Sequence, residues 1–188
     1  MTGIDLARRV LEGEDPKEVF RRVTLTDDPS FKRFYQSYLG TMFWSTTLPP
    51  YGECPMCGRE APLDYKDPEG YEEPVCSNCS EEQLNNDDAA EKNYDFDDLS
   101  DEFRRESMND CLAFFREFAN DIFEAGDIRG SNSFEAAGHD FWLTRCGHGA
   151  GFWDGDWPEE LGERLTEAAK GFGNVDVYVG DDGKLYGT

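Results

Sequence analysis

The stretch from residue 54 to residue 79 begins with Cys54-Pro-Met-Cys57 and ends with Cys76-Ser-Asn-Cys79. The two CxxC pairs are 18 residues apart, a spacing that lets four thiolates close a tetrahedron around one Zn²⁺. Gly58 suits the end of the first turn, because glycine tolerates a positive φ. Two disulfides in a secreted domain are the alternative interpretation, but the spacing favours a single structural zinc ion held by all four cysteines.

The composition on either side of the cysteine pairs divides the chain. Pro49-Pro50 precedes the first pair, and the acidic run at 85–99 follows the second pair and is typical of an exposed linker. Helical spacing over 3–12 and a helix start at Asp15-Pro16 predict a hairpin of two helices near the N-terminus. We therefore expect three parts: an N-terminal helical hairpin (1–30), a zinc-ribbon insertion (49–85), and an α+β domain (31–48 and 90–188).

Hydrophobic periodicity predicts the helices of the α+β domain. The clearest pattern runs from Ser100 to Ala125, where an apolar stripe lies opposite Asp, Glu and Arg residues. The residues of that stripe are Cys111, Leu112, Phe115, Phe118, Ile122 and Phe123. An aromatic helix is expected from Phe31 until Gly40, and an amphipathic helix is expected from Pro158 to Lys170.

Strands are expected where apolar and polar residues alternate or where β-prone residues gather. The expected strands are 42–47, 139–145, 152–153, 175–179 and 184–186. A glycine-rich turn at 147–151 separates two of them, and Asp182-Gly183 is a hairpin turn before the last. The predicted fold class is α+β, with a small antiparallel sheet packed against two or three helices and a zinc-ribbon-like module attached.

The composition describes a folded protein with a very acidic surface. The 188 residues include 41 Asp and Glu against 18 Lys and Arg, which gives a formal net charge of −23. The mean hydropathy is only −0.72. Aromatic residues nevertheless make up 14% of the chain, more than a disordered acidic segment carries. We therefore expect a compact aromatic core inside a negatively charged shell.

The sequence gives no sign of membrane insertion or secretion. No apolar run approaches 18 residues, and the N-terminus lacks the basic and apolar regions of a signal peptide. Cys111 and Cys146 remain after the four ligands are assigned, and they are interpreted as reduced thiols. These features predict a protein of a reducing cytoplasm that does not contact a membrane.

The negative charge restricts the partners of the protein. It repels nucleic-acid phosphates, so direct DNA or RNA binding is not expected even though zinc ribbons often serve that purpose. Three interpretations of the acidity stay open: adaptation to a salty cytoplasm, a surface directed at a basic partner protein, and simple solubility. Only 6 of the 18 cationic residues are Lys, which is in keeping with the first interpretation.

A second candidate site contains both histidines of the chain. His139, Asp140, His148, Asp154 and Asp156 are the only concentration of side chains with catalytic chemistry. They would form a metal site or an acid/base pair if two strands brought them together. The alternative is structural: the first two fix the start of a strand and the glycines make a tight turn. The spacing matches no known catalytic motif, so the structural interpretation is favoured.

Three tryptophans and three acidic runs complete the set of candidate features. Trp142, Trp153 and Trp157 are close in sequence and would stack bases or bind a protein if exposed, but core packing is favoured. The acidic runs at 64–73, 86–102 and 154–163 are candidates for copying the charge of DNA, and solvated faces are an equally good interpretation.

The segment GHDFWLTRCGHGAGFWD at 138–154 resembles the signature of a family of small proteins of tailed bacteriophages and prophages. Similar segments are Phe43-Trp-Ser45, Lys92-Asn-Tyr94 and Val177–Gly183, so the resemblance covers roughly 31–47 and 91–188. Members commonly have Asn at the position of Cys146, which makes that residue a poor candidate for an essential polar role. The cysteine module departs from the family pattern and is interpreted as an insertion.

The resemblance implies a viral protein that acts in a host cell, and it carries no established activity. Our first hypothesis is a non-enzymatic accessory protein for host takeover or anti-defence that binds a host nucleic-acid-handling protein by DNA mimicry. The second is an enzyme that acts on a nucleotide or signalling molecule through His139, Asp140, His148 and Asp154. The third is a zinc-ribbon adaptor in a viral or transcription assembly, with Met56 and Asn78 at the docking tips. The sequence does not predict the oligomeric state.

Overall fold

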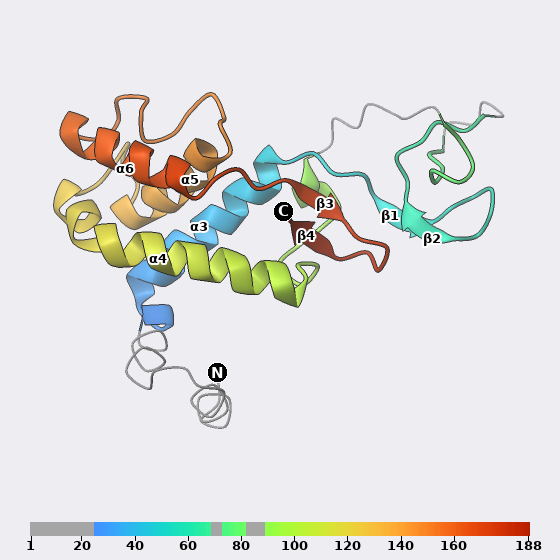
Figure 1. Cartoon of the computed structure of the whole chain (residues 1–188), viewed down its shortest axis with the longest axis horizontal. Coiled ribbons are helices and arrows are strands. Elements are labelled where there is room, and N and C mark those ends of the chain that lie inside the picture. The colour runs from blue at the N-terminus through green and yellow to red at the C-terminus, as the bar shows by residue number, and fades with distance from the viewer. Residues whose placement is uncertain (1–24, 69–72, 82–88) are drawn as a thin grey trace, which may run out of the picture. The chain divides into compact units, whose positions relative to one another are not determined.

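The computed structural model describes residues 25–68, 73–81 and 89–188 (Figure 1). The hairpin expected over 1–30 lies outside these ranges, apart from its last residues. The helices are α3 (Pro29–Ser45), α4 (Asp101–Ala125), α5 (Ser133–Arg145), α6 (Glu159–Gly171) and the short 3-10 helix η1 (Ala90–Lys92). The strands are β1 (Tyr51–Glu53), β2 (Glu60–Pro62), β3 (Val177–Val179) and β4 (Leu185–Gly187). The α+β class is confirmed, with two small antiparallel sheets, β1-β2 and β3-β4.

The chain divides into two compact units. Within the described residues, the first unit consists of 25–38 and Met108–Phe172, and the second consists of Leu39–Ser107 and Gly173–Thr188. No described helix is both long enough and apolar enough to cross a membrane.

Aromatic rings form the core of the first unit. Phe34, Phe114 and Phe141 come from α3, α4 and α5, and each ring is completely buried. The rings of Phe114 and Phe141 stack with centroids 4.3 Å apart, and Phe34 lies 5.9 Å from each of them. Aromatic pairs at such distances stabilise a core beyond the area that they bury. The aromatic content of the sequence is therefore concentrated where three helices meet.

A buried cation ties the ends of these helices together. The side chain of Arg145 is 3% exposed and lies at the end of α5. Its guanidinium donates to Tyr38 Oη at 2.9 Å, to Asp110 Oδ2 at 2.9 Å and to the Phe172 carbonyl at 3.1 Å. Burying an arginine without such partners would be very unfavourable. Arg145 therefore has a structural task that links α3, α4, α5 and the end of α6.

The strand expected over 139–145 is wrong, because this segment is the second half of α5. The helix begins after Asn132, whose side chain accepts a hydrogen bond from the Phe134 N–H at 3.1 Å as an N-cap. Residues 140–145 are all buried, so this half of the helix has no polar face to reveal its period. The strand expected at 152–153 is also wrong, since those residues lie in a turn after α5.

The helix expected to end at Gly40 instead continues to Ser45, so the strand expected over 42–47 is wrong as well. A Cβ atom at Gly40 would meet nothing within 4 Å, which shows that the glycine neither makes a turn nor permits a close approach. Met42 and Phe43 are buried, and burial outweighs the small helix penalty of a glycine and the β-preference that follows it.

The other expectations for helices and strands are largely confirmed. α4 and α6 match the expected helices to within a residue or two. Of the apolar stripe on α4, all members are buried except Phe123, which is 70% exposed. In the second unit β3 pairs with β4 across the expected turn, where Gly183 has a φ of 75°. Leu185 of β4 is fully buried and is bridged to Leu99.

The acidic run expected to be an exposed linker is partly packed where the structure describes it. Ala90, Tyr94 and Leu99 are buried, and the Tyr94 hydroxyl donates to the Pro49 carbonyl. Thr47 and Ala89 form an antiparallel bridge, so the two ends of the cysteine-containing segment lie side by side. Because its two ends lie close together, this segment can be accommodated without separating the elements that flank it.

Candidate metal centre

Two short turns bring the four cysteines of the CxxC pairs together. The β1-β2 hairpin contains the first turn, in which the Cys54 N–H donates to the Arg59 carbonyl and Gly58 adopts a φ of 67°. The second turn is closed by a bond from the Cys79 N–H to the Cys76 carbonyl at 2.9 Å. A reciprocal pair of backbone bonds between Tyr65 and Val75 holds this second turn opposite the first.

The four sulfurs have the geometry of a tetrahedral metal site. All four Sγ atoms lie within 4.8 Å of one another. The distances are 3.8 Å between Cys54 and Cys79, 3.7 Å between Cys57 and Cys76, and 3.8 Å between Cys76 and Cys79. A tetrahedron with metal–sulfur bonds of ~2.3 Å has edges of about 3.8 Å. The sulfurs are therefore spaced as four ligands of one ion.

The sulfurs are not joined to each other, and the pKa values of Cys54 and Cys79 are shifted in opposite directions. All six cysteines of the chain lie in the described residues and all are free thiols. Burial raises the pKa of Cys54, but hydrogen bonds from the backbone N–H groups of Cys76, Cys57 and Met56 lower it to about 6. A hydrogen bond with Cys57, together with burial, raises the pKa of Cys79 to about 12. Ionisation of one thiol thus disfavours ionisation of its neighbour, and a bound divalent cation would offset the repulsion between the two thiolates.

The module around the cysteines has very little apolar core of its own. Among its described residues, the buried apolar cluster consists of Cys54, Val75 and Cys76, with Ala61, Leu63, Tyr65 and Cys79 packed against them. A core this small does not hold a chain of this length in one conformation without a further staple. Four convergent thiols are the chemistry by which a metal ion supplies that staple.

The histidine cluster proves to be a hydrogen-bonded network around one buried carboxylate. Asp140 on α5 is 0% exposed. It accepts from His139 Nδ1 at 2.7 Å, from Trp157 Nε1 at 2.7 Å and from Arg129 Nη2 at 3.1 Å. The guanidinium of Arg129 also pairs with Asp156 at 3.0 Å and lies 3.9 Å from Asp154. Three donors therefore satisfy the oxygens of this buried carboxyl group, which would otherwise be costly to bury.

This arrangement separates the five residues of the expected cluster. Asp140, Asp154 and Asp156 surround Arg129, and His139 joins them through Asp140. The His148 backbone N–H donates to the Leu143 carbonyl, and its ring takes no part in this network. Within the described ranges, the four cysteines are the only group of three or more His, Cys, Asp or Glu placed to hold a metal ion. The geometry therefore favours the structural interpretation of the histidines over a metal or acid/base site.

Sequence reasoning missed Arg129, although it holds the network together. It lies in the loop between α4 and α5, has a left-handed φ of 54°, and its side chain is 39% exposed. Burial lowers the pKa of this guanidinium, but the nearby Asp140 and Asp156 raise it above its ordinary value. The only signal in the sequence is a lone cation in a loop of an acidic chain. That signal does not indicate which carboxylates the cation meets.

The three tryptophans separate into core and surface. Trp142 and Trp157 are 1% and 4% exposed, whereas Trp153 is 54% exposed. Core packing is therefore right for two of them, and no platform of three rings exists. Trp153 instead lies at the surface and lines a pocket together with residues of α6.

No protein-family model, no curated protein and no solved structure matches this chain. What the sites can do is accordingly inferred from their own residues.

Proposed function

We propose that Cys54, Cys57, Cys76 and Cys79 bind one structural Zn²⁺. The support is the tetrahedral spacing of the sulfurs, which matches metal–thiolate bonds of about 2.3 Å. Four thiolates leave no open position for substrate, so the ion stabilises the fold and does not take part in chemistry. Carboxylates outnumber every other ligand in this chain, but thiolates select zinc over the hard cations that carboxylates prefer.

Metal analysis of the purified protein tests this proposal. We expect one zinc per chain by native mass spectrometry, and a Cys57→Ser variant should lose it. Cys146→Ser is the matched control, because this half-buried thiol lies outside the module and its replacement should leave the zinc content unchanged. Zinc content near zero in the wild-type protein, or retained by Cys57→Ser, would contradict the proposal.

We further propose that the protein is a phage accessory protein that binds a host nucleic-acid-handling protein through its acidic surface, in the host cytoplasm and by mimicry of DNA charge. The observation that carries this proposal is the location of the carboxylates. Among the described Asp and Glu residues only Asp67 and Asp140 are buried, so the fold leaves nearly all of this charge at the surface. A protein with a basic nucleic-acid groove is the complement of such a surface.

The test is capture from nuclease-treated host lysate at low and high salt, followed by mass spectrometry. Retention of one basic nucleic-acid-binding protein, lost at high salt and displaced by duplex DNA, is the expected result. Steady binding at both salts without competition by DNA would refute charge mimicry. If no protein were captured at either salt concentration, the proposed binding function itself would be refuted.

A variant in the run 86–102 sharpens this test. Glu91, Asp97 and Glu102 are exposed, so their replacement by amides should not disturb packing. We expect the triple variant to bind the captured partner roughly 3–10-fold more weakly, mostly through slower association. The control replaces Glu91 and Glu102 by Asp, which keeps the charge. Equal affinity of the amide variant and the wild type would place the interface elsewhere.

A second candidate function, that of a zinc-ribbon adaptor, is favoured by the exposed tips of the two turns. Met56 is 43% exposed in the first turn, and Asn78 is exposed in the second. An apolar side chain held out by a rigid turn is a typical docking contact. If Met56→Ala abolished partner capture while the zinc stayed bound, the ribbon would be the docking surface.

A further inference from the structure

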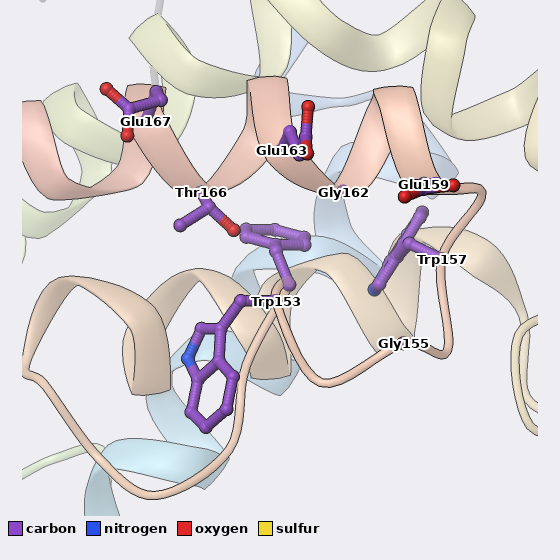
Figure 2. A pocket seen from close by; sticks show the side chains of 9 residues that line it. Trp153, Gly155, Trp157, Glu159, Gly162, Glu163, Thr166 and Glu167 are labelled. Atoms are coloured by element: carbon purple, nitrogen blue, oxygen red, sulfur yellow. The ribbon is translucent and has the colours of Figure 1, made fainter.

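A pocket lies between α6 and the loop that follows α5. The loop segment Gly151–Trp157, called the strap below, forms one wall, and α6 forms the other (Figure 2). The volume is about 730 Å³, which is within the range of small-molecule and side-chain pockets. The four clustered cysteines and His139 lie outside its lining.

The strap is held rigidly against its neighbours. The Phe152 N–H donates to Thr144 Oγ1 at 3.0 Å, and the φ of 150° at Gly151 lets the chain pass over that side chain. A Cβ atom at Gly162 of α6 would lie 2.7 Å from the Phe152 carbonyl, so only glycine permits this close approach. The walls of the pocket are therefore preorganised and do not need to form on binding.

Two tryptophans of the strap line the pocket, Trp157 as a buried ring and Trp153 as an exposed one. Trp157 is fixed by its bond to Asp140 and by an edge contact with Phe152, whose ring centroid is 5.4 Å away. Trp153 is 54% exposed, which is unusual for the largest apolar side chain in a chain that buries most of its rings. The face of an indole carries negative potential and attracts cations.

A buried hydroxyl without a partner also lines the pocket. Thr166 of α6 is 7% exposed, and its Oγ1 forms no hydrogen bond with any described residue. Figure 2 shows the Thr166 side chain on the side of α6 that faces the strap. Leaving such a group unsatisfied costs about 1–3 kcal/mol, so a ligand that donates to it would recover that free energy.

Three carboxylates follow one another along the same pocket wall. Glu159, Glu163 and Glu167 are four residues apart on α6, so they share one face of the helix. Each is exposed, and none forms an ion pair with another described residue. Like charges at this spacing destabilise a helix by roughly 0.2–0.5 kcal/mol per pair. Arg164 does not relieve them, because it pairs with Asp121 at 2.8 Å.

We propose that this pocket binds an organic cation, the ammonium or guanidinium group of a lysine or arginine side chain on a partner protein. The exposed indole of Trp153 would take the charged group, Thr166 Oγ1 would accept one of its hydrogen bonds, and the glutamates would neutralise it. No basic residue lines the pocket, so anions are excluded. The identity of the partner rests on the proposed function above, whereas the preference for cations does not.

Titration with small probes tests the pocket by itself. The probes are the N-acetyl methylamides of lysine, trimethyllysine and arginine, with those of norleucine and citrulline as neutral analogues. Binding is followed by NMR of the indole N–H groups in the full-length zinc-loaded protein. We expect a cationic probe to bind at least tenfold more tightly than its neutral analogue and to shift the Trp153 signal. Equal binding of cationic and neutral probes, or no binding at all, would overturn the proposal.

Variants assign the contacts. Trp153→Ala and Glu163→Gln should each weaken binding at least fivefold. Trp44 is also an exposed tryptophan but lies outside the pocket, so Trp44→Ala should leave binding unchanged. Thr166→Val keeps the shape and should weaken binding without lowering stability, an outcome that a purely structural role does not predict. If Trp153→Ala bound the probes as the wild type does, the pocket would not be the site.

The capture experiment distinguishes the pocket proposal from the proposed binding of a basic host protein. If probes bind but no basic protein is retained from lysate, the pocket stands and its source of cations is a free metabolite. If a basic protein is retained equally by wild type and Trp153→Ala, the acidic surface stands and the pocket proposal for that partner fails.

Discussion

At the scale of single residues, Asp140 shows how the fold uses a charge. Its carboxylate is completely buried and accepts three hydrogen bonds, from a histidine, a tryptophan and an arginine. The sequence indicated Asp140 as a candidate catalytic or metal-binding residue. In the structure, its carboxylate positions the side chains of Trp157 and Arg129. Because Trp157 lines the pocket, one buried carboxylate links the α5 helix to the candidate binding wall.

Asp140→Asn should therefore destabilise the protein. The amide removes the charge that Arg129 faces and presents an N–H group to donors, which costs about 2–4 kcal/mol. Urea unfolding measures the effect. Asp154→Asn is the control, since this carboxylate is partly exposed and 3.9 Å from Arg129, and its loss should cost under about 1 kcal/mol. Similar losses of stability for both variants would show that the burial of Asp140 does not explain its contribution.

At the scale of elements, two glycines inside helices have opposite meanings. A Cβ atom at Gly138 of α5 would lie 2.0 Å from the Phe34 carbonyl of α3, so the two helices touch through this residue. Gly40 of α3 has open space around the same position. Neither glycine has a positive φ, so backbone strain does not distinguish them and only packing does.

We expect Gly138→Ala to destabilise the protein by about 2 kcal/mol or more, because the backbone of α3 must move to admit the methyl group. Gly40→Ala should instead stabilise it by about 0.5–1 kcal/mol, the usual difference between these residues inside a helix. Thermal unfolding of both variants compares them directly. A gain in stability from Gly138→Ala would mean that α3 and α5 do not approach as described.

At the scale of the whole molecule, the net charge of −23 acts against folding. The described ion pairs are few beside the exposed carboxylates, so repulsion within the folded protein is only weakly compensated. Screening by salt should relieve it, and we expect the urea midpoint to rise between 10 mM and 1 M NaCl. An unchanged midpoint would show that the surface charges are too far apart in water for their repulsion to affect stability.

High pH should destabilise the molecule through its buried acidic groups. Burial raises the pKa of Cys111 well above the ordinary 9.0 and the pKa of Tyr38 well above the ordinary 10.0, and it raises that of Tyr94 to about 12. Above these ordinary values the unfolded chain releases the protons while the folded chain keeps them. The free energy of unfolding therefore falls as the pH rises from about 9.

Urea unfolding between pH 8 and pH 11 measures this loss. Tyr94→Phe gives the control, because a ring without a hydroxyl has no proton to release. We expect this variant to start less stable at pH 8, since the bond to the Pro49 carbonyl is lost, and then to fall less steeply with pH. A slope identical to that of the wild type would exclude Tyr94 from the alkaline transition.

The sequence by itself determined the features that depend on local spacing. The CxxC pairs predicted four converging thiols, the apolar periods predicted α4 and α6, and the alternating valines and Asp182-Gly183 predicted the C-terminal hairpin. In each case the signal comes from residues that are close together in the sequence. These are the two turns that carry the cysteines, the polar faces of the two helices and the turn of the hairpin. The α+β class followed from the same patterns.

The tertiary structure alone decided the features that depend on burial from several sides. The second half of α5 has no polar face, so its sequence did not distinguish a helix from a strand. The helix α3 continues past Gly40 because Met42 and Phe43 are buried. Arg129 and Trp157 acquire their roles from contacts with Asp140, which no local pattern in the sequence indicates. A sequence period reports which side of an element faces water, but it does not report what lies on the buried side.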